Sequence, residues 1–132
     1  MPVLVEEISE PSSQDFIDLQ KVFQDAPEWL LAPFTSREEL IHTAIAEHRL
    51  LAGRFNDRLL GAALLDKGEQ HWRLSHLCVR AVTRKRGVAR RLLAEAQRLA
   101  NAAGKPLHLA APAAHLESQA LAARTGLPLE TL

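Results

Sequence analysis

The chain has 132 residues, of which 47% are hydrophobic and 24% charged, and its basic and acidic residues balance to a net charge of zero. This length predicts one domain, residues 1–132, with a substantial core, and the longest apolar run, at residues 59–65, is far too short to cross a bilayer. The single Cys78 excludes an internal disulfide, and an acidic N-terminus stands where a secretory signal would be basic. Both features predict a cytoplasmic protein.

The first third of the chain predicts one strand and two helices. A β-rich run at residues 3–8 predicts the strand, and Ser12 can cap a helix whose apolar residues recur at helical spacing. Ser36 and Glu39 have the spacing of a capping box, in which the serine accepts from the Glu39 amide and the glutamate from the Ser36 amide. A second helix is therefore expected over residues 36–47.

Three antiparallel strands are predicted next. Residues 49–55 and 58–65 are extended runs joined by Asn56 and Asp57, which tolerate the positive φ of a two-residue hairpin turn. After a further turn, residues 70–79 read as the third strand of the same meander.

The last part of the chain predicts a long helix, a strand and a short helix. Apolar residues line one helical face between Gly87 and Gly104, and Gly104 stands where a C-terminal cap is expected. Residues 107–111 predict a buried strand, and residues 117–124 a final helix. This order predicts an α+β fold, with a mixed sheet on which the long helix packs.

The charges are distributed unevenly along the chain. Residues 80–91 contain six cations and no acid, which leaves ten cations against sixteen acidic residues elsewhere. One cationic patch on an otherwise acidic protein suits a compact anion better than a long polyanion. A basic helix start can also lie on nucleic acid or simply face solvent, but the acidic remainder argues against nucleic acid as a partner.

The cations surround the start of the long helix. Unpaired amides and the helix dipole attract anions there, whereas the cations at residues 84–86 and 90–91 oppose the dipole. Gly87 allows a ligand to approach the backbone, and Ala89 keeps the neighbouring surface small. A pyrophosphate is the anion that fits this arrangement.

The residues 77–79 and 84–89 together resemble the acyl-CoA signature of the GNAT superfamily, a strand ending Leu-x-Val followed by Arg/Gln-x-x-Gly-x-Gly/Ala at a helix start. The resemblance extends over nearly the whole chain and implies a GNAT acyl-CoA N-acyltransferase fold that binds acetyl-CoA. The implied coenzyme contacts are Leu77, Cys78, Val79, Thr83, Arg84, Lys85, Arg86, Gly87, Val88, Ala89 and Arg90.

Three blocks, at residues 18–21, 54–60 and 79–88, are similar to the PanZ (PanM) branch of that superfamily. This resemblance implies docking on the aspartate 1-decarboxylase zymogen, promotion of its maturation, and hence regulation of pantothenate synthesis. Arg54 and Asn56 are the implied partner contacts, although Asn56 is equally well explained as a turn former. The chain departs from the branch by an additional helical segment at residues 36–47 and by a shortened C-terminal strand.

Whether the chain is an enzyme stays open. GNAT acetyl transfer usually employs a tyrosine as general acid, and this sequence contains no tyrosine. Ser118, His115 and Cys78 are possible substitutes, while His76 and Glu69 are candidate bases. None of these residues has a pattern specific to catalysis, so a non-catalytic regulator and an amine N-acetyltransferase are both retained.

No metal site is predicted. His71 and His76 are separated by an odd number of residues in a predicted strand, so they point to opposite faces and cannot chelate one ion. Trp29 and Trp72 are interpreted as packing residues.

Overall fold

A six-stranded mixed sheet organises the computed structural model, which describes residues 2–83 and 86–132. The strands follow one another across the sheet in chain order, β1 to β4 antiparallel and β4, β5 and β6 parallel. Their bounds are β1 Leu4–Glu7, β2 Leu50–Phe55, β3 Arg58–Lys67, β4 Trp72–Val79, β5 Leu107–Ala111 and β6 Leu129–Thr131. The predicted α+β class with a mixed sheet is confirmed.

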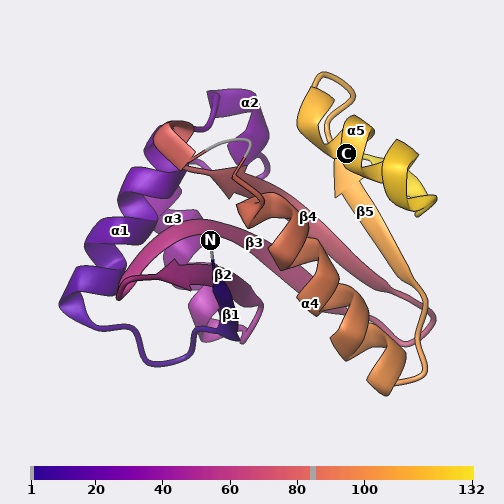
Figure 1. The fold of residues 1–132 in the computed structure, drawn as a ribbon. Helices are drawn as coiled ribbons and strands as arrows, with labels where there is room; N and C mark the ends of the chain where they lie inside the picture. Colours follow the sequence, from indigo (N-terminus) through magenta and orange to yellow (C-terminus); the bar gives the residue numbers. More distant parts are fainter. Residues whose placement is uncertain (1, 84–85) are drawn as a thin grey trace.

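The helices cover both faces of the sheet (Figure 1). They are α1 Ser13–Gln24, α2 Glu28–Leu31, α3 Arg37–Ala46, α4 Val88–Ala102 and α5 Leu116–Thr125, with a 3-10 turn, η1, at Ala81–Thr83. α1 and α3 pack on one face, while α4 and α5 contribute to the core on the other. Among the described residues no helix combines the length and apolarity needed to span a membrane.

Two elements are absent from the order of elements predicted from the sequence. α2 is a single turn of four residues after Pro27, too short to display a periodic pattern. β6 has three residues and is held by parallel pairing with β5, a long-range interaction that local sequence does not encode. It corresponds to the shortened C-terminal strand by which the sequence was expected to depart from the PanZ branch.

The two helix caps differ from each other. Ser12 and Asp15 form a complete capping box at α1, with the Asp15 amide 3.0 Å from Ser12 Oγ and the Ser12 amide 3.3 Å from Asp15 Oδ2. At α3, Ser36 accepts from the Glu39 amide as predicted, at 3.1 Å. The prediction for Glu39 was wrong, because its carboxylate accepts from the Thr35 amide and hydroxyl instead of the Ser36 amide.

Positive backbone φ angles occur at the turn positions predicted from the sequence, and also at His48 and His76, which the sequence did not indicate. Asn56 (φ 49°) and Asp57 (φ 64°) form the β2–β3 turn, and Gly104 (φ 71°) follows the end of α4. These positions were identifiable because few residue types adopt that conformation cheaply.

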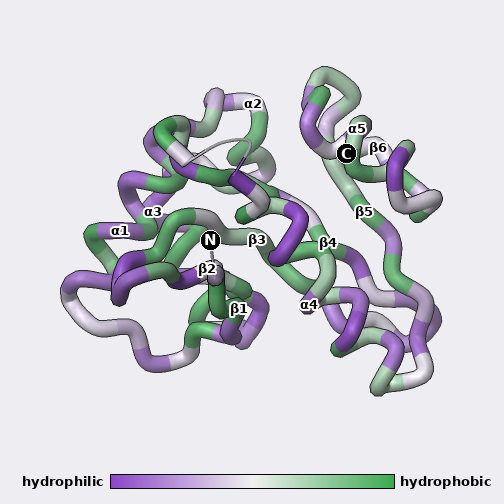
Figure 2. Tube along the Cα trace, viewed as in Figure 1, coloured by the Kyte–Doolittle hydropathy of each residue, from purple (hydrophilic) through white to green (hydrophobic). Residues whose placement is uncertain are grey.

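The inner strands are hydrophobic on both faces, as the green tube of β2, β3 and β4 shows (Figure 2). The close approach of α4 to this sheet depends on Gly61, where an added Cβ would lie 2.8 Å from Val88 Cγ1. Val88, the first residue of α4, is buried against the sheet. The packing therefore fixes the start of α4 next to the end of β4.

Candidate functional site

The site begins where β4 and β5 separate. Their parallel pairing covers only Trp72–Leu74 on β4 and residues 107–109 on β5, and in Figure 1 the two strands diverge beyond this point. A β-bulge in the β3–β4 pairing, with His76 at φ 54°, bends β4 in the same region. The end of β4 consequently has no β5 partner for residues 77–79.

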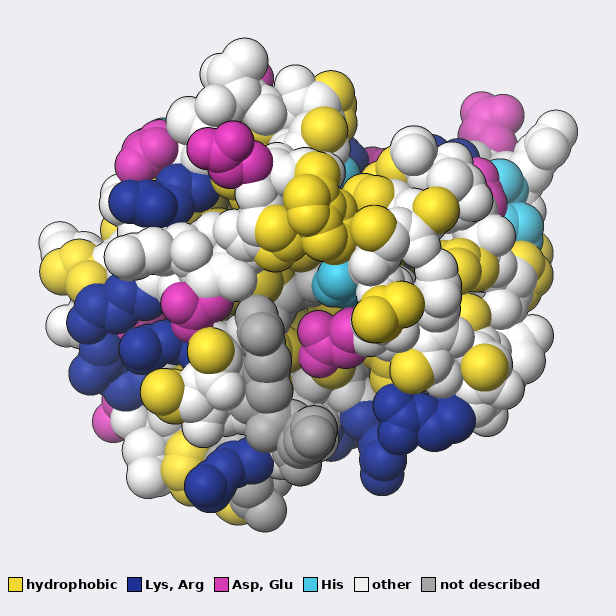
Figure 3. Space-filling view, turned by 90° about the horizontal axis from the view of Figure 1, so that it is seen from above, with side chains coloured by type: hydrophobic (Ala, Val, Ile, Leu, Met, Phe, Trp, Pro, Cys, Tyr) yellow, Lys and Arg dark blue, Asp and Glu magenta, His cyan; other side chains and the backbone are white. Residues whose placement is uncertain are grey.

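A pocket of about 260 Å³ lies at this opening. Leu77 and Cys78 of β4 form one wall, the α2 region the second, and the start of α5 the third. Figure 3, which looks down on this end of the molecule, shows hydrophobic side chains grouped around a histidine with an acidic side chain beside it. The complete lining is Pro27, Trp29, Leu30, Leu77, Cys78, Ala114, His115, Leu116 and Glu117.

The start of α4 has the features of an anion site. Its N-cap is Gly87, in the left-handed conformation (φ 88°), which supplies no side chain to cap the first-turn amides. A Cβ at this position would meet no atom of the described residues within 4 Å, so on that side the backbone is open to a ligand. Arg86 and Arg90 are exposed and form no ion pair within residues 2–83 and 86–132. The predicted contacts Arg84 and Lys85 lie outside the described residues.

The segment between β4 and α4 contributes a further polar group. Arg80 Nε is buried without a hydrogen-bond partner in the described part of the chain. Thr83 Oγ1 donates to the Arg80 carbonyl at 3.0 Å, and the Ala81 amide donates to Asp25 Oδ2 at 2.9 Å, so η1 is tied to the end of α1. A buried guanidinium nitrogen without a partner is costly unless a ligand or water satisfies it, which fits a coenzyme phosphate nearby.

The side chains at the end of β4 are mostly unavailable to a ligand. Leu77, Cys78 and Val79 are each at most 3% exposed, and Cys78 Sγ lies 3.2 Å from the Val22 carbonyl. Leu77 and Cys78 line the pocket, whereas Val79 does not. The side chain of Val88 is likewise in the core, so at these predicted positions the backbone is the part best placed to contact a coenzyme.

His115, Ser118 and Glu117 bring polar chemistry to the pocket wall at the start of α5. His115 Nδ1 lies 2.6 Å from Ser118 Oγ, and both residues are buried. Glu117 Oε2 lies 3.9 Å from His115 Nε2, and the Trp29 ring meets the His115 ring edge-on at 6.0 Å. Of the five candidate catalytic residues, only Cys78 and His115 line the pocket.

His76 and Glu69 do not reach the pocket. His76 Nε2 donates to the Ala32 carbonyl at 2.7 Å, so Nδ1, 2.9 Å from Ser75 Oγ, accepts from that hydroxyl. Burial lowers the pKa of His76 below its ordinary value, which keeps the ring neutral. Glu69 lies in the β3–β4 turn and lines a different cavity. Both nitrogens of His76 therefore serve packing and hydrogen bonding.

The implied partner residue Arg54 is fully engaged within the chain. Its five N–H groups point to Glu6, Asp15 and the Asp57 carbonyl at 3.0–3.4 Å. These hydrogen bonds, the one to Asp15 first, raise the pKa of Arg54. Asn56 is exposed at the turn. A partner would therefore meet the guanidinium of Arg54 already bound to carboxylates, and the exposed side-chain amide of Asn56. The roles of Arg54 and Asn56 as partner contacts stay predictions.

A second ion pair, between exposed Arg58 and buried Asp18, joins α1 to the same hairpin. Arg58 Nη2 lies 2.7 Å from Asp18 Oδ1, and Asp18 also accepts from the Leu59 amide at 3.0 Å and from Gln14 at 2.9 Å. Burial raises the pKa of Asp18, but these hydrogen bonds outweigh it, so its pKa lies below the ordinary 3.8. The sequence blocks at residues 18–21 and 54–60 thus meet in one structural unit, the α1–hairpin surface, formed by α1 and the β2–β3 turn.

The structure gives Trp29 and Arg80 positions at the candidate site that the sequence analysis did not predict. Trp29 is 44% exposed at the pocket, although it was interpreted as a packing residue. An exposed tryptophan is a signal for binding, but exposure cannot be read from a sequence. Arg80 was counted in the cationic cluster, yet only the structure shows that its Nε is buried.

Comparison with known proteins identifies a family and a set of relatives. Residues 2–129 match the family model described as acetyltransferase (GNAT) domain, PanZ. A PanD regulatory factor from Escherichia coli is 40% identical over 87 residues, and one from Salmonella typhimurium is 38% identical over 84 residues. These alignments cover 66% and 64% of this chain, and the chain spans only about three fifths of either relative, 60% and 58%.

Solved structures share the fold at low sequence identity. PH1933 from Pyrococcus horikoshii superposes with a TM-score of 0.73 at 13% identity, covering 95% of this chain and 88% of that one. N-acetylglutamate synthase from Neisseria gonorrhoeae, crystallised with coenzyme A and N-acetyl-glutamate, gives 0.71 at 20% identity over 94% and 28% of the two chains. The PaiA N-acetyltransferase from Thermoplasma acidophilum, in complex with coenzyme A, gives 0.70 at 16% over 95% and 89%.

Proposed function

The chain belongs to the PanZ family of acetyltransferase (GNAT) domains, and from this membership we propose that it binds acetyl-CoA and regulates an aspartate 1-decarboxylase. In this proposal the coenzyme lies along the end of β4, and the α1–hairpin surface docks on the decarboxylase zymogen and promotes its maturation. A protein with this role works in the cytoplasm, where its single buried cysteine stays reduced.

The observation that carries the coenzyme proposal is the separation of β4 from β5 beside an uncapped helix start. The edge of residues 77–79, which lacks a β5 partner, would bind the amides of a pantetheine arm, and the first-turn amides of α4, which have no side-chain cap, would bind the pyrophosphate. Arg86 and Arg90, with the predicted contacts Arg84 and Lys85, would neutralise its charge, and the predicted contact Thr83 would lie beside them as a neutral polar residue. The thioester end would then reach the pocket at Cys78 and His115.

The partner proposal rests on the PanD regulatory factors and on the α1–hairpin surface. Two ion pairs, Arg54–Asp15 and Arg58–Asp18, hold the β2–β3 turn against α1, so Asn56 is presented on a rigid support. A rigid, exposed amide suits hydrogen bonding to the backbone of a partner.

Mixing the purified chain with the homologous decarboxylase zymogen, with and without acetyl-CoA, tests this role. We expect a complex on size exclusion and faster cleavage of the zymogen when acetyl-CoA is present. Asn56→Gly keeps the positive φ of the turn but removes the amide, so it should weaken the complex while leaving acetyl-CoA affinity unchanged. Absence of a complex in both conditions, without faster cleavage, would refute the regulatory role.

One observation favours acetyl transfer as a second candidate function. His115 stands at the thioester end of the pocket with Ser118 on one ring nitrogen and Glu117 near the other, which is an arrangement able to move a proton to a departing thiolate. Release of coenzyme thiol across a broad amine panel measures this activity. Transfer that is lost in His115→Gln would support it, and no release from any amine would argue for the regulator.

A further inference from the structure

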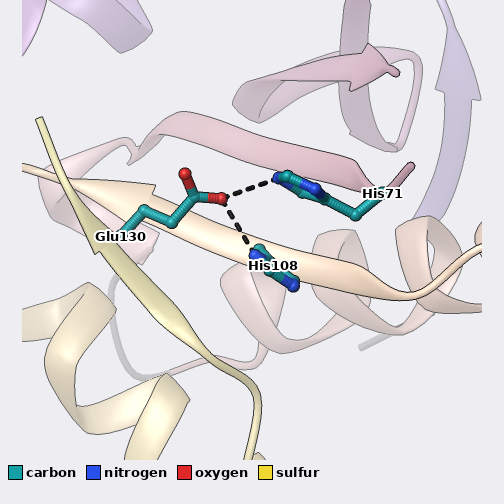
Figure 4. Close-up of side chains that lie close together, drawn as sticks. All are labelled: His71, His108 and Glu130. Carbon is teal, nitrogen blue, oxygen red and sulfur yellow. Dashed lines mark hydrogen bonds and ion pairs between the residues drawn. The ribbon is translucent and has the colours of Figure 1, made fainter. Parts of the chain in front are cut away.

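Three polar side chains from the far edge of the sheet converge on one another. His71 immediately precedes β4, His108 lies in β5, and Glu130 lies in β6. Glu130 Oε2 is 3.0 Å from His71 Nε2 and 3.0 Å from His108 Nδ1 (Figure 4). The two imidazole rings stack with centroids 4.0 Å apart.

The parallel register explains why these residues meet. Arg73 of β4 is opposite His108, which places His71 two residues earlier on the same face, and Ala110 of β5 is opposite Glu130. The neighbouring residues of β5, Leu107 and Leu109, belong to the core on the α4 face. His108 therefore points to the opposite face.

We propose that His71, His108 and Glu130 form a binding site for a divalent transition-metal ion, with zinc as the best fit. Two imidazole nitrogens and one carboxylate oxygen are typical of a three-ligand zinc site that keeps a fourth position for water. The three ligand atoms lie within 4.8 Å of one another, and in a tetrahedral zinc site such atoms are roughly 3.3 Å apart. Small side-chain movements therefore convert the observed cluster into a coordination sphere.

The cluster is partly open to solvent, as a site of this kind requires. The three side chains are 25–33% exposed, so an ion can enter and a water can complete its coordination. A cavity of about 380 Å³, lined by the β3–β4 turn and including His71 and Arg73, opens next to it. Within residues 2–83 and 86–132, no other group of three His, Cys, Asp or Glu residues converges in this way.

Arg73 can distinguish a metal site from a cluster that is only structural. It donates to Glu130 Oε1 at 3.0 Å, which orients the carboxylate but places a positive charge near the proposed ion. If the cluster only holds the strands together, removal of Arg73 should weaken the contacts of Glu130 and leave zinc binding absent. If the cluster binds a metal, removal of this cation should strengthen binding, because a repulsive charge disappears while all three ligands remain.

A bound ion would join the short strand β6 to β5 and to the start of β4, at the end of the sheet where β4 and β5 are paired. β6 has three residues and is the short strand at the edge, and the only ion pairs joining it to β4 and β5 among the described residues are those of Glu130. The chain between β5 and β6 contains α5, whose start forms a wall of the pocket at His115. Zinc should therefore stabilise the C-terminal segment against unfolding.

The test is calorimetric titration of ZnCl₂ into the full chain, freed of any purification tag, near neutral pH. We expect one zinc per chain, a raised unfolding temperature, and an intense visible absorption when Co²⁺ replaces zinc. His108→Gln and Glu130→Gln should each weaken binding by more than about a hundredfold, beyond the effect of losing an outer-shell group. Arg73→Gln should bind more tightly than the unchanged chain.

His42→Gln is the matched control, since His42 is an exposed histidine on α3 away from the cluster. It should bind zinc as the unchanged chain does, and circular dichroism should show that the other variants are folded. Zinc binding that is absent from the unchanged chain, or equally tight in His108→Gln, overturns the proposal. Weaker binding in Arg73→Gln would also contradict it.

Discussion

The α1–hairpin surface and the start of α4 employ arginine in opposite ways. On the α1–hairpin surface, Arg54 and Arg58 are bound to Asp15 and Asp18, which are almost completely buried. At the start of α4, Arg86 and Arg90 are exposed and form no ion pair with any residue in the described ranges 2–83 and 86–132. The first region uses its charges to hold two segments together, and the second leaves them available for a ligand.

The difference shows that a count of cations does not locate a binding site. Each region is rich in basic residues, but Arg86 and Arg90 at the α4 start have no carboxylate partner among the described residues, whereas Arg54 and Arg58 each have at least one. An arginine whose donors are all satisfied contributes to architecture, whereas unpaired arginines around free helix amides create a local attraction for anions. Substitutions in one region should therefore change stability, and substitutions in the other should change ligand binding.

The largest effect is expected at Gly87. In Gly87→Asp a carboxylate would stand where the coenzyme phosphates are proposed to bind, and the open space around Gly87 means that the fold can accept the side chain. We expect acetyl-CoA affinity to fall by roughly a hundredfold, about 2–3 kcal/mol, as measured by calorimetric titration.

Gly104→Asp separates this effect from backbone strain. Gly104 lies at the other end of α4, also has a positive φ (71°), and also has nothing within 4 Å of an added Cβ. Both variants bear the cost of a side chain in the left-handed region, but only Gly87→Asp should lose the coenzyme. Equal acetyl-CoA affinity in the two variants would show that the coenzyme does not bind at the start of α4.

The next largest effect is expected at Asp18, and it concerns stability. Asp18→Asn removes the charge that pairs with Arg58 and disturbs the acceptor for the buried Leu59 amide. The free energy of unfolding should fall by about 2–3 kcal/mol in urea titrations, while acetyl-CoA affinity stays unchanged. The same carboxylate-to-amide change at Glu95, whose side chain is less buried than that of Asp18 (18% against 2% exposed), should cost much less. Similar losses in both variants would mean that burial of Asp18 adds nothing.

The elements that local chemistry specifies were predictable from the sequence. Asn56 and Asp57 marked the hairpin turn, and Gly87 and Gly104 marked the ends of the long helix, because few residue types adopt a positive φ cheaply. The cationic cluster could also be placed at the start of α4 from sequence, since its residues around Gly87 are contained in one short stretch. These features depend on neighbours within about ten residues.

The pocket and the ion pairs were not predictable, because they depend on contacts between distant segments. Asp18 and Arg58 are 40 residues apart, and His115 meets Trp29 across the opening between β4 and β5. His71 was compared with His76 along one predicted strand, whereas the structure brings it to His108 and Glu130 through parallel pairing. A sequence shows which side chains are present, but strand order determines which of them meet.

The smallest predicted effect sharpens the same comparison through pH. The hydrogen bond from Arg54 lowers the pKa of Asp15 below its ordinary 3.8, although burial opposes the shift. Because the folded pKa lies below the unfolded value, this contribution to stability is complete above the unfolded pKa and is lost as the pH falls through the folded one. Arg54→Gln removes the main cause of the shift, so its free energy of unfolding should fall less steeply between about pH 5 and pH 3 than that of the unchanged chain.

Arg90→Gln makes the same substitution at the α4 start and should keep the original steepness, since Arg90 has no carboxylate partner among the described residues. If Arg54→Gln and Arg90→Gln follow the same acid-unfolding curve, the ion pair of Arg54 with Asp15 contributes no measurable pH dependence to stability.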